Sequence, residues 1–200
     1  MNSIVEKIWE YGAILVSTDE GFELASGHKS PIYIDCRSLI SYPDVMDLIA
    51  DEAAKIVKET GTEILAGGET AGIPYATWIS ARTKVPMTYI RRRPKGYGRT
   101  SQIEGSMDAG KKVLLVEDLI TSGYSKDSFV EGIRNSGATV EHCLVVFDRE
   151  QGGRKRLKNL GIELHSLATL SETLEYGLKN NELTQEDYKK IQKYLKADSE

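Results

Sequence analysis

A strand-like run in the middle of the chain ends in two acids and a loop of small polar residues. The stretch Val113–Ser125 reads VLLVEDLITSGYS, and Glu117 and Asp118 directly follow its four apolar residues. Successive backbone N–H groups in a tight turn at a helix start form an anion site, which Gly123 allows a phosphate to approach closely. Carboxylates repel a phosphate but suit sugar hydroxyls or hydrated Mg²⁺. The pattern predicts a site for a phosphorylated sugar, with hydroxyl donors from Thr121, Ser122 and Ser125.

A second candidate is a cationic loop, RRRPKGYGR, at residues 91–99. Its cations are Arg91, Arg92, Arg93, Lys95 and Arg99. The proline and the two glycines within the loop argue against a helix with one basic face. We therefore expect a mobile lid over a polyanion. The alternative for such a cluster is a solvated surface or a nucleic-acid contact.

A third loop, GGETAG at residues 67–72, follows another short apolar run. It lacks the glycine spacing of a dinucleotide fingerprint, and the chain has no Walker A motif. By itself this loop indicates only a turn from strand to helix. An acid pair after a strand is likewise, in isolation, more often a solvated loop than a binding site.

Strand and helix patterns alternate along the chain. Runs of apolar residues predict strands at 32–36, 63–68, 87–90, from 113 onward, 140–147 and 162–167. Helical spacing predicts helices at 4–15, 43–59, 73–82, 125–135, 171–178 and 184–195. Strands joined through helices pair in parallel, so we expect one α/β domain over residues 1–200, with a mainly parallel central sheet flanked by helices. Ligands bind such sheets beyond the carboxyl ends of the strands, where the three loops lie.

Composition limits the class of protein. The chain has 200 residues, 40% of them hydrophobic and 28% charged, as in ordinary globular domains. Its net charge of −4 argues against a general nucleic-acid binder. Cys36 and Cys143 lack metal-like spacing and predict reduced thiols in a cytoplasmic protein, while no apolar run is long enough for a membrane span. The three histidines are interpreted as structural or surface residues.

The acid pair and its T-S-G-x-S loop resemble the phosphoribosyl-pyrophosphate signature of type I phosphoribosyltransferases. Four further segments resemble orotate phosphoribosyltransferases in their order and spacing. They are ASGHKSPIYIDCR (25–37), GGETAGIP (67–74), RRRPKGYGRTSQIEG (91–105) and FDREQGG (147–153). The similarity covers essentially the whole chain. It implies the type I phosphoribosyltransferase fold, with residues 1–40 contributing a small hood over the orotate site. It also implies the reaction of orotate with 5-phosphoribosyl 1-pyrophosphate (PRPP) to orotidine 5′-monophosphate and pyrophosphate, in pyrimidine (UMP) biosynthesis.

Carried over residue by residue, the resemblance implies a set of site residues. The catalytic residues are expected to be Lys95, Glu117 and Asp118, with the two acids at the ribose hydroxyls. PRPP is expected to contact Thr70, Ala71, Arg91, Arg92, Lys95, Tyr97, Glu117, Asp118, Leu119, Ile120, Thr121, Ser122, Gly123, Tyr124 and Ser125. Orotate is expected to contact Tyr33, Ile34, Thr121 and Arg149, whose guanidinium would hold the orotate carboxylate. The implied cofactor is Mg²⁺, held mainly through the substrate, so no protein metal ligand is expected.

The chain departs from the family pattern at three positions. Arg92 stands where many members have lysine, and Tyr97 stands where many have histidine. Tyr97 therefore lacks a group that titrates near neutral pH, which puts a general-acid role there in doubt. Ala25 stands where some members have lysine, so that contact is missing.

The resemblance also implies a homodimer with shared active sites, because in the family the cationic loop reaches into the neighbouring subunit's site. Two other classes stay open. A phosphoribosyltransferase for purines or uracil is disfavoured by Arg149, since an acidic base is what requires a carboxylate clamp. A regulatory protein that senses PRPP and binds nucleic acid is disfavoured by the negative net charge and the intact cationic loop.

Overall fold

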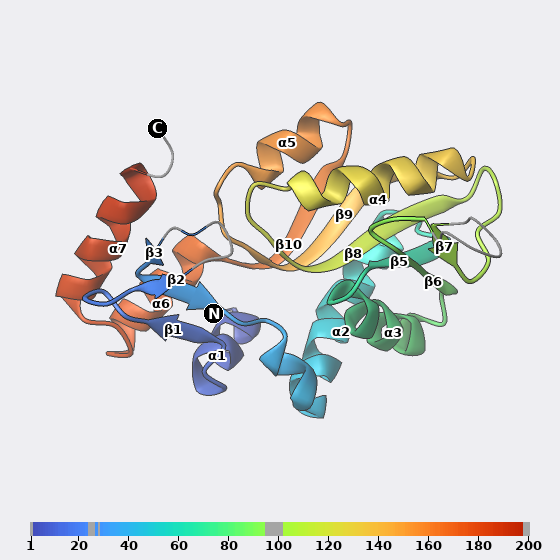
Figure 1. The fold of residues 1–200 in the computed structure, drawn as a ribbon. Coiled ribbons are helices and arrows are strands. Elements are labelled where there is room, and N and C mark those ends of the chain that lie inside the picture. Colours follow the sequence, from blue (N-terminus) through green and yellow to red (C-terminus); the bar gives the residue numbers. More distant parts are fainter. Residues whose placement is uncertain (1, 24–26, 28, 95–101, 198–200) are drawn as a thin grey trace.

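The computed structural model of the chain describes residues 2–23, 27, 29–94 and 102–197. Its centre is a six-stranded sheet in the order β10-β9-β8-β5-β6-β7 (Figure 1). Neighbouring strands pair in parallel, except that β7 pairs antiparallel with β6. The strands are β5 (Ile64–Gly68), β6 (Met87–Ile90), β7 (Ile103–Glu104), β8 (Lys112–Ile120), β9 (Thr139–Asp148) and β10 (Glu163–Thr169). The expected α/β class with a mainly parallel sheet is confirmed.

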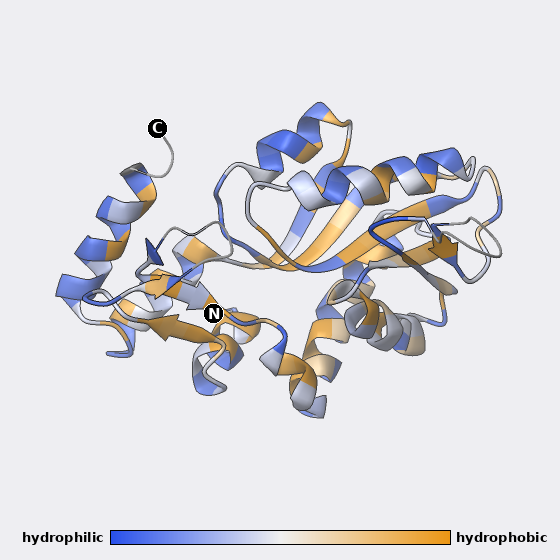
Figure 2. Ribbon diagram, viewed as in Figure 1, coloured by the Kyte–Doolittle hydropathy of each residue, from blue (hydrophilic) through white to orange (hydrophobic). Residues whose placement is uncertain are grey.

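Helices cover both faces of this sheet. Figure 1 shows α4 (Tyr124–Asn135) and α5 (Gly153–Asn159) on one face, and α2 (Pro43–Glu59) and α3 (Gly72–Thr83) on the other. The sheet thus separates two hydrophobic clusters. The central strand β8 is buried at almost every position, as expected for a parallel strand covered on both faces. Figure 2 shows that the central strands are hydrophobic, whereas α5 and α7 (Gln185–Ala197) are largely hydrophilic.

The N-terminal and C-terminal elements lie at the same side of the sheet (Figure 1). The N-terminal part contains α1 (Ser3–Glu10), β1 (Ile14–Val16), β2 (Phe22–Glu23), β3 (Lys29–Ser30), β4 (Ile32–Ile34) and the 3₁₀ helix η1 (Ser38–Ser41). β1 pairs antiparallel with β4, and β2 with β3. The C-terminal part contains α6 (Leu170–Lys179) and α7, and α6 begins with a capping box formed by Thr169 and Glu172.

The N-terminal helix is shorter than predicted. It ends at Glu10, and Gly12 then adopts a φ of +64° in the turn that leads to β1. Leu15, assigned by its helical spacing to the same helix, instead lies in β1 and pairs with Tyr33 of β4. The other predicted helices and strands are present, with ends that shift by a few residues. The prediction missed the strands β1, β2, β3 and β7, because two or three residues are too few to show a period. It also missed the short helices α5 and η1.

Both cysteines are buried and free, as expected for reduced thiols. Among the residues that the structure describes, no helix combines the length and apolar composition that a bilayer span requires.

Candidate active site

A hollow of about 540 Å³ lies at the carboxyl end of β8. Its walls come from β8 and the following loop, from the segment that begins in β4, and from Arg92 after β6. We call it the main hollow, and it is lined by Glu23, Tyr33, Ile34, Asp35, Cys36, Arg37, Arg92, Glu117, Asp118, Leu119, Thr121, Ser122, Gly123, Tyr124, Ser125 and Lys126. The site therefore lies at the edge of the sheet where an open α/β fold binds its ligands.

The loop after β8 has the conformation of an anion site. Gly123 adopts a left-handed φ of +81° and caps α4, which begins at Tyr124. The first N–H groups of a helix have no acceptor within it, and the helix dipole adds positive potential there. Nearby, the Arg156 guanidinium lies 3.7 Å from the centre of the Tyr124 ring. The loop can therefore receive a phosphate, as its sequence predicts.

Glu117 forms a buried ion pair. Its Oε2 accepts a hydrogen bond from Lys126 Nζ, and the residues are only 5% and 4% exposed. Burial raises the pKa of Glu117 above its ordinary value, while the Lys126 charge opposes that rise. The carboxylate also lies against Gly68 and Gly72, where an added Cβ would overlap it or approach within 2.8 Å. Glycines at these positions thus make room for the buried acid.

Asp118 has a different partner. Because successive side chains of a strand point to opposite faces, it points away from the Glu117 pair. Its Oδ2 lies 3.5 Å from Arg37 Nε, and the residue is 6% exposed, whereas the Arg37 side chain is 70% exposed. Asp118 therefore combines a shielded carboxylate with a partner that can move into solvent.

The comparisons with known proteins agree with this geometry. Residues 38–161 match the model of the phosphoribosyl transferase domain. The orotate phosphoribosyltransferase of Ruegeria sp. is 45% identical over 193 residues, which cover 94% of this chain and 85% of the relative. The chain belongs to the orotate phosphoribosyltransferase family. In structure, it is similar to the orotate phosphoribosyltransferase of Aeropyrum pernix, with a TM-score of 0.77, 32% identity, and coverage of 86% of this chain and 97% of the other.

A larger protein contains the same fold. The UMP synthase of Leishmania donovani matches with a TM-score of 0.85 and 29% identity. The match covers 98% of this chain but only 42% of the Leishmania chain. The orotate phosphoribosyltransferase fold thus corresponds to a part of that longer protein.

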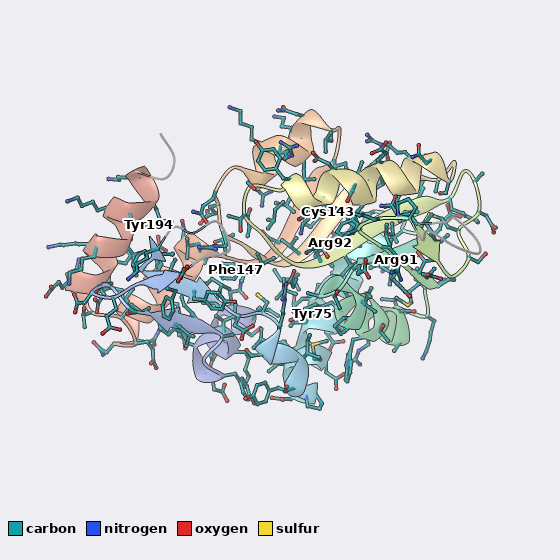
Figure 3. The ribbon with its side chains drawn as sticks, in the orientation of Figure 1. Tyr75, Arg91, Arg92, Cys143, Phe147 and Tyr194 are labelled. Carbon is teal, nitrogen blue, oxygen red and sulfur yellow. The ribbon has the colours of Figure 1, made fainter. Side chains whose placement is uncertain are left out.

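The PRPP residues inferred from family resemblance fall into several groups. The main hollow is lined by Arg92 and by every predicted residue of the β8 segment except Ile120, which is buried beside it. Arg91 lies outside that lining, with its guanidinium 3.8 Å from both Glu69 and Glu104; Figure 3 labels both arginines. Thr70 and Ala71 precede α3 and also lie outside the lining. Lys95 and Tyr97 fall outside the described residues.

The predicted orotate residues are also divided. Tyr33, which is 40% exposed, and Ile34 line the main hollow together with Thr121. Arg149 directly follows β9, and its backbone N–H donates to the Ile120 carbonyl at 3.0 Å. Its side chain lines a second hollow of about 420 Å³ with residues of α6 and α7. The assigned roles of all these residues stay predictions.

The sequence analysis missed two partners of the acid pair, Lys126 and Arg37. One signal for Lys126 was available. A lysine in the first turn of a helix opposes the helix dipole, so its place there indicates an acidic partner. Arg37 carried no comparable signal, because its contact joins segments 81 residues apart.

Proposed function

We propose that this protein is an orotate phosphoribosyltransferase that transfers the 5-phosphoribosyl group of PRPP to orotate. The products are orotidine 5′-monophosphate and pyrophosphate, in the route to UMP. The single observation that carries the proposal is membership of the orotate phosphoribosyltransferase family over most of both chains. The main hollow supports it, since one wall can hold a phosphate and another offers a shielded carboxylate.

The reaction moves charge in a way that the site residues can stabilise. The bond between ribose C1 and the pyrophosphate oxygen breaks, and its electron pair leaves with pyrophosphate. The deprotonated ring nitrogen of orotate supplies the pair for the new C1–N bond. Positive charge develops on the ribose, where Asp118 is favourable, and negative charge develops on pyrophosphate, where Arg92 is favourable. One such contact typically supplies about 3 kcal/mol of barrier reduction, or about 100-fold in rate.

Glu117 and Lys126 have a positioning role in this proposal. Their buried pair anchors the end of β8 to the first turn of α4. The phosphate loop connects those two elements, so the pair holds its two ends at a set distance. Glu117 also lines the main hollow, next to Asp118. Its predicted contact with the ribose would be made from that wall.

We propose Mg²⁺ as the cofactor. Mg²⁺ is typically bound through one or two carboxylates together with substrate phosphates and water. Asp118 fits this requirement, because it lines the main hollow beside the exposed Arg37 side chain, whereas Glu117 is already paired with Lys126. The ion would still be held mainly through PRPP. When bound with PRPP, the ion would neutralise pyrophosphate charge. We further propose a cytoplasmic homodimer in which the cationic loop at residues 91–99 serves the partner's site, as the resemblance implies.

The proposal is tested by measuring pyrophosphate release from PRPP with Mg²⁺ and different acceptor bases. We expect release with orotate but not with uracil or purines. Release with a purine and not with orotate would assign the chain to another phosphoribosyltransferase class. No release with any base, combined with PRPP binding, would support the regulatory alternative.

The role of Arg149 is tested separately. Arg149→Ala should abolish orotate use and leave PRPP binding largely intact, because the lost group would pair with the orotate carboxylate. Lys196→Ala is the matched control, since Lys196 is an exposed cation lining the same second hollow. Equilibrium binding of each substrate to both variants provides the measurement. Unchanged orotate affinity in Arg149→Ala would show that the carboxylate is held elsewhere.

A further inference from the structure

Three metal-ligating side chains meet on one face of the sheet, away from the main hollow. His142 lies on β9, and Glu163 and His165 lie on the neighbouring edge strand β10. Glu163 pairs in register with His142, and His165 is two residues further along, so all three project from the same face. Cys143, labelled in Figure 3, points to the opposite face, into the cluster that packs under α4.

The spacing of these groups matches a metal coordination shell. His142 Nδ1 shares a hydrogen bond with His165 Nε2 at 3.1 Å, whose proton a metal ion would replace, and it lies 3.6 Å from a Glu163 carboxylate oxygen. All three ligand atoms lie within 4.8 Å of one another. Ligands held at about 2.0–2.2 Å around a tetrahedral zinc ion are separated by roughly 3.4 Å. Small side-chain rotations therefore suffice to bring the three atoms around one ion.

The environment suits a metal of the zinc class. The His142 side chain is 26% exposed and that of Glu163 is 67% exposed, so an ion can enter from solvent. Two imidazoles and one carboxylate select Zn²⁺ and similar transition metals, whereas Mg²⁺ prefers oxygen ligands alone.

We propose that His142, Glu163 and His165 form a binding site for a divalent transition metal, with Zn²⁺ as the representative ion. Bound metal would join the edge strand β10 to β9 and so stabilise that edge of the sheet. The site is separate from the proposed catalytic centre. Five residues of β9 lie between His142 and Asp148 at its carboxyl end, and these six residue steps correspond to about 20 Å along the strand.

The test is calorimetric titration of Zn²⁺ into the substrate-free protein, together with thermal unfolding with and without Zn²⁺. We expect one site in the wild type, a higher Tm with Zn²⁺, and no such rise with Mg²⁺. Loss of a residue that merely supports a metal ligand weakens binding about 10- to 100-fold. His142→Ala, His165→Ala and Glu163→Gln should therefore weaken Zn²⁺ binding at least about tenfold.

Glu131→Gln is the matched control, because this exposed carboxylate belongs to α4, which covers the opposite face of the sheet. It should bind Zn²⁺ as the wild type does. Circular dichroism without metal checks that each variant folds. If a histidine variant unfolds, Glu163→Gln still tests the site, because it alters only an exposed group. Replacement by Co²⁺ should give visible absorption that the folded ligand variants lose. Wild-type Zn²⁺ affinity in the folded variants, or no Zn²⁺ binding by the wild type, would overturn the proposal.

Discussion

Glu117 and Asp118 are adjacent in the chain, but their carboxylates have different environments. Glu117 is paired with Lys126 inside the protein, and Asp118 faces the partly solvated Arg37. The first arrangement suits a structural anchor for the phosphate loop. The second leaves a carboxylate available to substrate. The two acids are therefore expected to respond differently to substitution.

Lys126→Met should destabilise the protein by about 3–5 kcal/mol, because it leaves the buried Glu117 without a counter-charge. Urea unfolding at pH 7 provides the measurement. The double variant Glu117→Gln, Lys126→Met removes both charges and should recover much of this loss. Equal stability of the wild type and Lys126→Met would show that the pair makes no net contribution to folding.

The effect of Lys126→Met should also depend on pH. Lys126 lowers the pKa of Glu117 against the effect of burial, so its removal raises that pKa further. An acid whose pKa is higher in the folded than in the unfolded protein contributes stability below its unfolded pKa of about 4.3. It loses that contribution as the pH rises through the folded pKa. The stability difference between wild type and variant should therefore grow from pH 4 towards neutrality, and a difference independent of pH would contradict this cause.

Asp118→Asn should lower turnover about 100-fold or more while changing the free energy of unfolding little. Its pair with Arg37 contributes little stability, since an ion pair with a solvent-exposed arginine is worth about 0–1 kcal/mol. Steady-state kinetics and urea unfolding of the same preparation separate the two effects. Normal turnover would mean that the Asp118 carboxylate does not stabilise the transition state.

At the scale of elements, the site depends on the close approach of α3 to β8. Gly72, the first residue of α3, lies so close to β8 that an added Cβ would overlap the Val116 carbonyl oxygen. The same Cβ would lie 2.8 Å from Glu117 Oε1. Because both neighbours belong to a central strand, neither can move aside easily.

Gly72→Ala is therefore expected to destabilise the protein by about 1–3 kcal/mol through overpacking. Gly132→Ala in α4 is the control, since its Cβ would meet only the end of the Gln102 side chain, at 2.9 Å. Movement of the Gln102 amide would weaken its hydrogen bonds to the Arg91 and Ser128 carbonyls. Alanine, however, favours a helix over glycine by up to about 1 kcal/mol, so the net loss should be smaller than for Gly72→Ala. Urea unfolding compares the two variants. If Gly72→Ala were no less stable than Gly132→Ala, α3 would not be held tightly against β8.

At the scale of the whole molecule, the proposed active site combines segments from most of the chain, and the proposed dimer adds the cationic loop of a second copy. Lys95→Ala and Asp118→Asn would then disable different contributions to one site. A mixed dimer would contain one site with both defects and one site with neither. This arrangement makes the shared site measurable by mixing two inactive proteins.

Mixing Lys95→Ala with Asp118→Asn should restore up to about a quarter of the wild-type activity after subunit exchange. Random exchange makes half of the dimers mixed, and each mixed dimer has one intact site of two. Subunit exchange is verified independently with differently tagged chains, and activity is measured as orotate-dependent pyrophosphate release. Verified exchange without recovery would show that each cationic loop serves its own subunit.

The sequence by itself determined the order of most helices and strands, the parallel sheet and the position of the phosphate loop. These features follow from short-range patterns: helical spacing, apolar runs such as that before Glu117, and turn residues such as Gly123. Such patterns repeat every few residues, so they can be recognised in a single sequence. The short strands β1 and β7 showed no such period, and only pairing with β4 and β6 defines them.

Only the tertiary structure decided which side chains meet. It pairs Glu117 with Lys126 and Asp118 with Arg37, and it places Arg149 in a second hollow. It also brings His142 to Glu163 and His165, through the register of β9 and β10. Strand register and side-chain partners are set by packing between segments distant in the chain, and local periodicity carries no information about that packing.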